Sequence, residues 1–226
     1  MMNHVLDNPI WNALISKNSN LSLGDENIKY FPGDIAPFAG LKDVNQDYLK
    51  LLFNMLPGKR IVVLITAVNV EIPSSWKIIN RNVILQMVAE NPDAPNAIEE
   101  KIVPLEKEHV PQMLALTKLA NPGPFSDRTI EFGNYSGIFK SGHLVAMAGQ
   151  RFHLDRYAEI SAVCTHPDYM GNGYGSKLIL QQAQRMMQQG DIPFLHVRAN
   201  NAGAIKLYKA LGFITRQEMN LNVIQK

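Results

Sequence analysis

Apolar residues recur along the chain at helical and at alternating spacing, and this pattern predicts its elements. In the first hundred residues, the apolar positions of 46–56 have helical spacing and end at Pro57-Gly58, which predicts a helix. The β-branched run 60–68 predicts a buried strand, and 82–89 predicts a second, less regular one. We therefore expect a small α/β unit whose core contains four large aromatic side chains: Trp11, Phe31, Phe38 and Trp76.

The rest of the chain has a more regular pattern. Strands are expected at 101–105, 135–139, 144–151, 158–165 and 193–198. Helices are expected at 110–119, 176–188 and 202–211. Residues 140–143 predict a hairpin turn, and one or two further strands are expected over 213–223. Hairpins followed by alternating strands and helices predict a mixed sheet flanked by helices, an α+β or α/β layer arrangement.

A linker is predicted at residues 91–96, Asn-Pro-Asp-Ala-Pro-Asn, because prolines and Asn/Asp favour turns. The balance of charge changes at the same place. Residues 1–100 carry 8 basic and 11 acidic side chains, whereas residues 101–226 carry 14 basic and 9 acidic ones. We therefore expect a small α/β domain of unknown role over 1–95 and a second domain over 101–226.

Composition excludes several classes of protein. With 46% hydrophobic residues and a formal net charge of +2, the chain resembles ordinary globular proteins and gives no reason to expect nucleic acid as a partner. The longest apolar run, 61–70, is about half of what a membrane span needs, and the first residues lack a signal-peptide pattern. A soluble, cytoplasmic protein without a membrane partner is expected. The one cysteine, Cys164, excludes an internal disulfide and a thiolate-rich zinc site, and no metal is expected.

The most informative segment is 163–177, VCTHPDYMGNGYGSK, in which a predicted strand passes through three alternating glycines directly into a helix. Glycine permits positive φ and lets a ligand approach the main chain closely. The first amides of a helix form an anion site. The segment thus predicts a phosphate or pyrophosphate held by the main chain at 171–176, with Lys177 as charge support. It fits neither the dinucleotide fingerprint nor the P-loop, and a tight structural turn is the alternative.

At these residues the chain resembles the GNAT superfamily of acyl-CoA-dependent N-acyltransferases. The family's pyrophosphate motif, Arg/Gln-x-x-Gly-x-Gly/Ala, falls on 170–175, with Met170 in place of Arg or Gln. The preceding strand ends in His166-Pro167, as is frequent in the family. Residues 201–213, NAGAIKLYKALGF, match the family segment Asn-x-x-Ala-x-x-Leu-Tyr-x-x-x-Gly-Phe. The resemblance covers 101–226, and it implies a mostly antiparallel sheet whose central strands splay apart.

The resemblance also implies an activity and a set of residues. The activity is transfer of an acetyl or other acyl group from acetyl-CoA, or another acyl-CoA, to a primary amine in a ternary complex. An N–H of the preceding strand would polarise the thioester carbonyl. Tyr208 would protonate the leaving thiolate. The pantetheine arm would contact the main chain at Val163, Cys164 and Thr165, together with Asn201. The pyrophosphate would lie against Met170, Gly171, Asn172, Gly173, Tyr174, Gly175 and Ser176.

No motif defines the group that takes the amine proton. Glu159, at the start of the splayed strand, lies where such enzymes often place an acidic base that acts directly or through water; the alternative is a solvated carboxylate at a strand end. Structural roles are expected for His143, His166 and His196. Cys164 lies near the expected thioester, but no histidine is placed by sequence to activate it, so a covalent route is not favoured.

Other functions remain open at the level of sequence. A non-catalytic acyl-CoA-binding or sensor module would keep the glycine loop without needing Tyr208 as an acid, and that side chain would then simply be core. Transfer to a hydroxyl group is a third possibility. Arg128, in the 121–134 loop, could pair with a substrate carboxylate or could be a solvated loop cation. The acceptor, a small-molecule or peptide amine, is not defined by the sequence, nor are the acyl chain length and the oligomeric state, a homodimer included.

Overall fold

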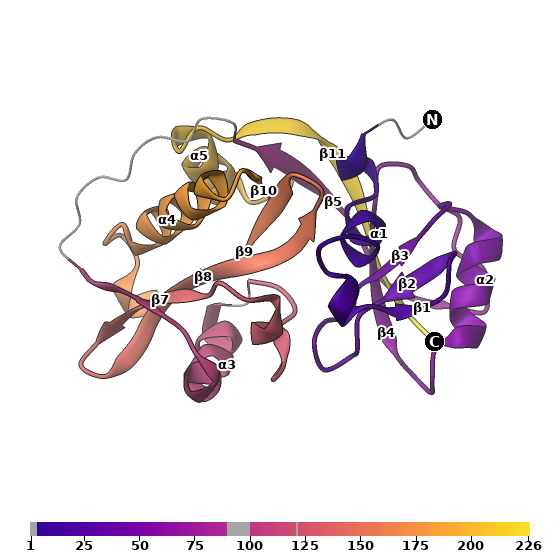
Figure 1. The fold of residues 1–226 in the computed structure, drawn as a ribbon, viewed down its shortest axis with the longest axis horizontal. Coiled ribbons are helices and arrows are strands. Elements are labelled where there is room, and N and C mark those ends of the chain that lie inside the picture. The colour runs from indigo at the N-terminus through magenta and orange to yellow at the C-terminus, as the bar shows by residue number, and fades with distance from the viewer. Residues whose placement is uncertain (1–3, 90–99, 121) are drawn as a thin grey trace.

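One eight-stranded sheet runs through the molecule (Figure 1). The computed structural model describes residues 4–89, 100–120 and 122–226, and its strand order is β4-β11-β5-β10-β9-β8-β7-β6. Neighbouring strands are antiparallel except β9 and β10, which are parallel. The strands are β4 Ile61–Thr66, β5 Lys77–Val88, β6 Ile102–Pro104, β7 Ser136–Lys140, β8 His143–Leu154, β9 Tyr157–Thr165, β10 Ile192–Arg198 and β11 Ile214–Gln225.

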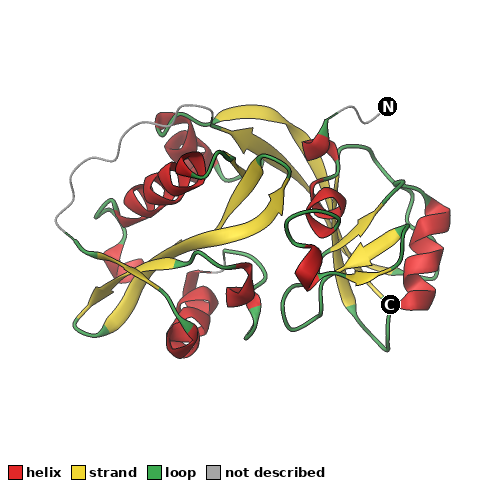
Figure 2. Cartoon of the chain, viewed as in Figure 1, coloured by secondary structure: helices red, strands yellow, loops and turns green. Residues whose placement is uncertain are grey.

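Helices cover both faces of this sheet (Figure 2). Helices α4 (Tyr174–Gln188) and α5 (Ala202–Ala210) lie on one face, and α3 (Val110–Ala120) lies on the other. The apolar side of α4 is buried with residues of β9 and β10, as its helical spacing predicts. The expected mixed, mostly antiparallel sheet flanked by helices is confirmed.

The chain before β4 forms a second lobe beside one end of the sheet (Figure 1). It contains a small three-stranded sheet and two helices: β1 Leu23–Gly24, β2 Ile28–Tyr30, β3 Ala39–Leu41, α1 Pro9–Leu14 and α2 Gln46–Met55. The N-cap Asn45 accepts a hydrogen bond from the Tyr48 amide at 2.9 Å, so α2 begins where this cap satisfies a free N–H. The four aromatic residues expected in the core are all buried: Trp11, Phe31, Phe38 and Trp76.

Strands from both sides of the expected boundary share the large sheet. The linker expected at 91–96 lies outside the described residues, and the division into 1–95 and 101–226 stays a prediction. The structure adds that β5 lies between β11 and β10, and that β4 pairs with the far side of β11. Residues that precede the expected boundary are therefore placed where they can line a site on the sheet.

The centre of the sheet is split between β9 and β10. Their pairing covers only three residue pairs and ends at Phe194 with Glu159, after which β10 continues against β5 and β9 against β8. Beyond the last pair, the register between β8 and β9 shifts, and Ala162 has φ of 53°, a conformation uncommon for a residue with a side chain. The splay predicted from the resemblance is present, and it leaves one edge of β9 unpaired with β10.

None of the helices within the three described ranges combines the length and the apolar character needed to cross a membrane.

Candidate active site

A cavity of about 1130 Å³ lies at the split between β9 and β10. The end of β9, the glycine loop and the start of α4 form one side of it, and α5 contributes a second side. Strands β4, β5, β10 and β11, Arg151 of β8, the loop 122–126 and residues of the N-terminal lobe that include Phe38 also line it. The predicted cofactor residues line this cavity with one exception, Asn172, whose side chain instead donates a hydrogen bond to the Tyr169 carbonyl at 3.0 Å.

The glycine loop has the backbone that an anion site requires. Gly171 and Gly173 have φ of 82° and 75°, and Gly173 is the N-cap of α4 without a side-chain cap hydrogen bond. The first amides of α4 are therefore available to a ligand. A Cβ on Gly175 would meet only the Thr165 hydroxyl, at 3.8 Å, so this position keeps open space rather than avoiding a clash within the protein. The loop fits a pyrophosphate group held by main-chain amides.

Two side chains expected beside the cofactor are engaged with the protein itself. Lys177 donates from Nζ to the Glu100 carbonyl at 2.6 Å. Asn201 caps α5, because its Oδ1 accepts a hydrogen bond from the Ala204 amide at 3.1 Å. Asn201 also lines the cavity. The sequence match around Asn201 thus includes a helix-capping role, and its contact with a cofactor stays a prediction.

Tyr208 projects from α5 and lines the cavity while its ring packs against Phe213. Its hydroxyl makes no hydrogen bond to another residue in the described part of the chain. Burial raises the pKa of Tyr208 to about 12, so its phenol is protonated at neutral pH. The side chain is partly buried and packs against the hydrophobic core, and its hydroxyl is a donor available to the cavity.

Cys164 also faces the cavity from β9, and its residue is buried. Burial raises the pKa of the Cys164 thiol to about 12. The thiolate is the reactive form of cysteine, and it is almost absent here at neutral pH. The structure therefore provides no activated nucleophile at this position.

Glu159 is not exposed to solvent, and it is not among the residues that line the cavity. It is fully buried, and both of its oxygens receive hydrogen bonds from Arg151, from Nε at 2.7 Å and from Nη2 at 2.6 Å. Nδ1 of His196 lies 2.7 Å from Glu159 Oε1. Burial by itself would raise the pKa of this carboxyl, but Arg151 and the His196 hydrogen bond outweigh burial and lower it to about 2. Direct contact between this carboxylate and an amine in the cavity is not favoured by this geometry.

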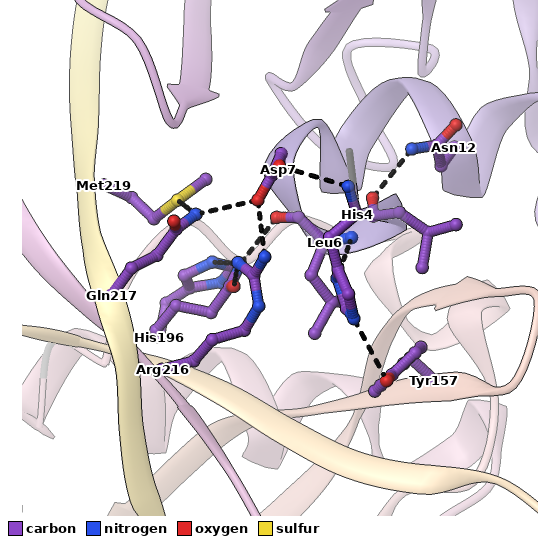
Figure 3. A network of polar contacts seen from close by, with 11 residues as sticks. His4, Leu6, Asp7, Asn12, Tyr157, His196, Arg216, Gln217 and Met219 are labelled. Atoms are coloured by element: carbon purple, nitrogen blue, oxygen red, sulfur yellow. Dashed lines mark hydrogen bonds and ion pairs between the residues drawn. The ribbon is translucent and has the colours of Figure 1, made fainter. Parts of the chain in front are cut away.

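His196 belongs to a longer chain of polar contacts (Figure 3). The Oε1 atom of Gln86 accepts a hydrogen bond from Arg216 Nη1 at 2.8 Å. The amide nitrogen of Gln86 therefore points the other way, and it lies 2.9 Å from the Leu6 carbonyl oxygen and 3.1 Å from His196 Nε2. We assign the His196 proton to Nδ1 from this network, because its Nε2 must accept from Gln86. Arg216 in turn pairs with Asp7 at 2.6 Å. The structural role expected for His196 fits these contacts, whereas the network itself was not visible in the sequence.

Arg128 does not line the cavity. It pairs with Asp34 at 3.0 Å and with Glu131 at 2.6 Å, and so connects the 121–134 loop to the N-terminal lobe. Arg128 is exposed, as the alternative of a solvated loop cation had it, and it is also ion-paired, whereas a contact with a substrate carboxylate stays a prediction. Two other arginines line the cavity, Arg151 of β8 and Arg198 at the end of β10, and sequence reasoning singled out neither.

The side of the cavity away from the glycine loop combines an apolar surface with two amide side chains. The apolar residues come from β4, β5, β11 and the segment before β4: Ile61, Val63, Ile65, Ile84, Leu221, Val223 and Phe38. The amides are Asn80 and Asn82 of β5. Among the described lining residues there is no Asp or Glu, and the Lys/Arg side chains are Arg151 and Arg198. Most of this wall precedes the expected domain boundary, which is why it was not assigned to the site from sequence.

Comparison with known proteins agrees with this geometry. The family model described as FR47-like protein matches residues 135–221. A crystal structure of a putative GNAT-family acetyltransferase from Novosphingobium aromaticivorans is 32% identical, with a TM-score of 0.90 over 98% of each chain. The [ribosomal protein bS18]-alanine N-acetyltransferase of Escherichia coli K12 is 30% identical over 117 residues, 48% of this chain and 77% of that protein. A GCN5-related N-acetyltransferase from Kribbella flavida, 15% identical with a TM-score of 0.57 over 93% of this chain and 95% of that one, shares the fold.

Proposed function

The chain belongs to the GNAT family of acetyltransferases, and we propose that it transfers an acetyl group from acetyl-CoA to a primary amine. The observation that carries the proposal is the cavity at the β9–β10 split, which brings the glycine loop, the β9 main chain and Tyr208 together. A cavity that also extends along β4 and β11 has room for an acceptor beside the thioester. This supports direct transfer within a ternary complex.

The cofactor arm would be held mainly by backbone. In the proposed complex, the amides at 171–176 hold the pyrophosphate, and the main chain of β9 at Val163, Cys164 and Thr165 bonds the pantetheine amides where β10 has moved away. Met170 replaces the family's Arg or Gln, but the residue is 65% exposed, and in the proposed complex the phosphate contacts come from the main chain. The substitution therefore leaves the anion site in place.

Two groups of the chain act on the reacting thioester in this proposal. An N–H of β9 donates to the thioester carbonyl and stabilises the charge that develops there. Tyr208 gives its phenolic proton to the departing sulfur of CoA. In water a thiol, with a pKa of about 8.5, is more acidic than a phenol, with a pKa of about 10, so this transfer would be uphill.

The burial of both groups reduces that mismatch. Burial raises the pKa of the Cys164 thiol in this cavity, and it also raises the pKa of Tyr208. A CoA thiolate released in the same cavity loses water in the same way and becomes more basic. The proton transfer is then less unfavourable than it is in water.

Glu159 serves this reaction indirectly. Because it is fully buried behind Arg151 and His196, we assign it the role of holding those two side chains in place. Its role as a base, expected from the resemblance, would require a relay of water rather than contact. Among the described lining residues no carboxylate is available for the amine proton, and the acceptor is expected to bind as the free amine or to lose its proton to water.

The alternative, a non-catalytic acyl-CoA-binding module, is tested at Tyr208. Release of thiol from acetyl-CoA is followed with a panel of primary amines, for the wild type and for Tyr208→Phe, alongside calorimetric binding of acetyl-CoA. We expect amine-dependent thiol release by the wild type and unchanged cofactor binding by the variant with a much lower kcat. Cofactor binding without thiol release from any amine would favour the binding module.

A further inference from the structure

We propose that the acceptor amine also carries a carboxylate and an apolar body, as an apolar amino acid does, and that Arg151 binds this carboxylate. The inference rests on the proposed function, because it identifies the acceptor of that transfer. Three observations carry it: the fixed position of the Arg151 guanidinium, the charges of the cavity wall, and the apolar surface beside Arg151.

The Arg151 guanidinium is held from two sides. On one side, the Glu159 carboxylate accepts hydrogen bonds from Nε and Nη2 of Arg151 at 2.7 Å and 2.6 Å. The rings of Phe38 and Phe152 lie against the guanidinium, each with its centroid 4.6 Å from Cζ. Nη1 makes no hydrogen bond to another residue of the described chain, and the side chain lines the cavity with 15% of its surface exposed. Nη1, at the edge of the guanidinium that faces the cavity, is thus an oriented donor, and a ligand can bind to it without reordering the side chain.

The charges of the wall favour an anionic ligand group over a cationic one. Since the described lining residues include no Asp or Glu, a polyamine would leave its additional ammonium groups without a partner. Glu159 neutralises Arg151 only from inside the sheet, where it is fully buried. A guanidinium has five N–H donors, so the edge that faces the cavity can still receive a carboxylate.

An apolar surface begins next to this donor. Phe38, beneath Arg151, forms a parallel bridge with Val63, and the Val63 amide donates to the Pro37 carbonyl at 2.8 Å. Val63 is followed along the wall by Ile65 and by Leu221 and Val223 of β11, beyond which the cross-strand partners Asn82 and Asn80 of β5 add amide groups. A ligand whose carboxylate meets Arg151 therefore has its side chain against β4 and β11, where burial of apolar surface adds to its affinity.

The first test varies the acceptor and leaves the protein unchanged. Leucine, leucinamide and 3-methylbutylamine share one apolar body and carry a carboxylate, a neutral amide and no carbonyl group, respectively; spermidine serves as a polycationic amine. We expect kcat/KM for leucine to exceed that for leucinamide and 3-methylbutylamine by at least tenfold, with no turnover of spermidine. Equal or faster turnover of 3-methylbutylamine would overturn the assignment.

The second test varies the arginine. In Arg151→Lys and in the double variant Arg151→Gln/Glu159→Gln, which removes both charges of the buried pair, we expect KM for leucine to rise at least tenfold. KM and Kd for acetyl-CoA should stay unchanged, which also reports that each variant is folded. Arg128→Gln is the matched control, because Arg128 lies outside the cavity wall, and its KM for leucine should stay at the wild-type value. An unchanged KM for leucine in both Arg151 variants would contradict the role of this side chain.

The outcomes separate this inference from the function on which it rests. If acetyl-CoA does not bind, the proposed function fails. If acetyl-CoA binds and amines are acetylated without preference for a carboxylate, only the acceptor assignment fails. If acetyl-CoA binds and neither this panel nor the wider panel of primary amines is acetylated, the proposed function fails as well.

Discussion

Arg151 and Glu159 form a bidentate ion pair inside the sheet, in which Nε lies 2.7 Å from Oε2 and Nη2 lies 2.6 Å from Oε1. The Glu159 side chain is 1% exposed and the Arg151 side chain 15%, so the pair presents only its cationic member to the cavity. His196 Nδ1 makes a further hydrogen bond to the same carboxylate. The role of Glu159 as a base stays a prediction, and its burial against Arg151 leads to a prediction about stability.

Replacing Glu159 by Gln should destabilise the protein by about 3 kcal/mol at neutral pH, because it leaves the largely buried Arg151 without its counter-ion. The pKa of Glu159 is about 2 in the folded protein against an ordinary value of 4.5. The unfolded chain therefore takes up this proton first, and the contribution of Glu159 is present above pH 4.5 and is lost as the pH falls toward 2. Urea unfolding at pH 7 and pH 3 should show the gap between wild type and variant narrowing. A gap of constant size would show that the carboxylate is not held in its ionised form.

Tyr208→Phe should lower kcat by roughly 10²-fold or more, since general acid catalysis contributes factors of that order, with little change in Kd for acetyl-CoA. Because burial raises the pKa of Tyr208 to about 12, the wild-type kcat should not fall as the pH passes 10, where an ordinary phenol ionises. Rates of thiol release up to pH 10.5 provide the measurement. Tyr157→Phe, at a tyrosine outside the cavity wall, is the control. A loss of kcat with a midpoint near pH 10 would be inconsistent with this account.

Gly175→Ala should separate folding from cofactor binding. The new Cβ meets only the Thr165 hydroxyl at ordinary contact distance, and the backbone here is helical, so the melting temperature should not fall. The methyl group projects into the space assigned to the pyrophosphate, and Kd for acetyl-CoA should rise at least tenfold. Gly190→Ala, which also meets open space but lies at the far end of α4, is a control for binding; its φ of 83° makes a small loss of stability expected there. Unchanged affinity in Gly175→Ala would place the phosphates elsewhere.

Cys164→Ala should retain transfer activity, because burial keeps the Cys164 thiol protonated and direct transfer does not need it. Intact-protein mass spectra recorded during turnover should show no acetyl adduct on the wild type. An acetyl group found on Cys164, together with loss of activity in the variant, would establish a covalent route instead.

Local patterns in the sequence predicted most of the elements on the glycine-loop side of the cavity. The glycine loop, the helix that follows it and the segment with Asn201 and Tyr208 were placed correctly, because each is a local motif with its own periodicity. Strand β5 begins at Lys77, earlier than expected, since residues 77–81 are all exposed and give no alternation. Helix α1 and strands β1–β3 were not predicted, because elements of two to six residues are too short to show a period.

The acceptor side could not be predicted in the same way. Its wall depends on the pairing of β4 and β5 with β11, strands that are far apart in sequence. The contact of His196 with Gln86 depends on β10 lying against β5, so no local pattern reveals it. Arg128 looked available because it lies in a loop, whereas Arg151, within an apolar strand, gave no sign that it faces a cavity.

The central claim is that the cavity at the β9–β10 split binds acyl-CoA for transfer to an amine, and calorimetric titration with acetyl-CoA tests it most directly. CoA and desulfo-CoA are titrated in parallel, because they share the pyrophosphate and pantetheine contacts without the thioester. We predict one site per chain for all three ligands, with dissociation constants of about 1 to 100 μM. Binding of none of them would contradict the account and would reduce the loop at 171–176 to a structural turn.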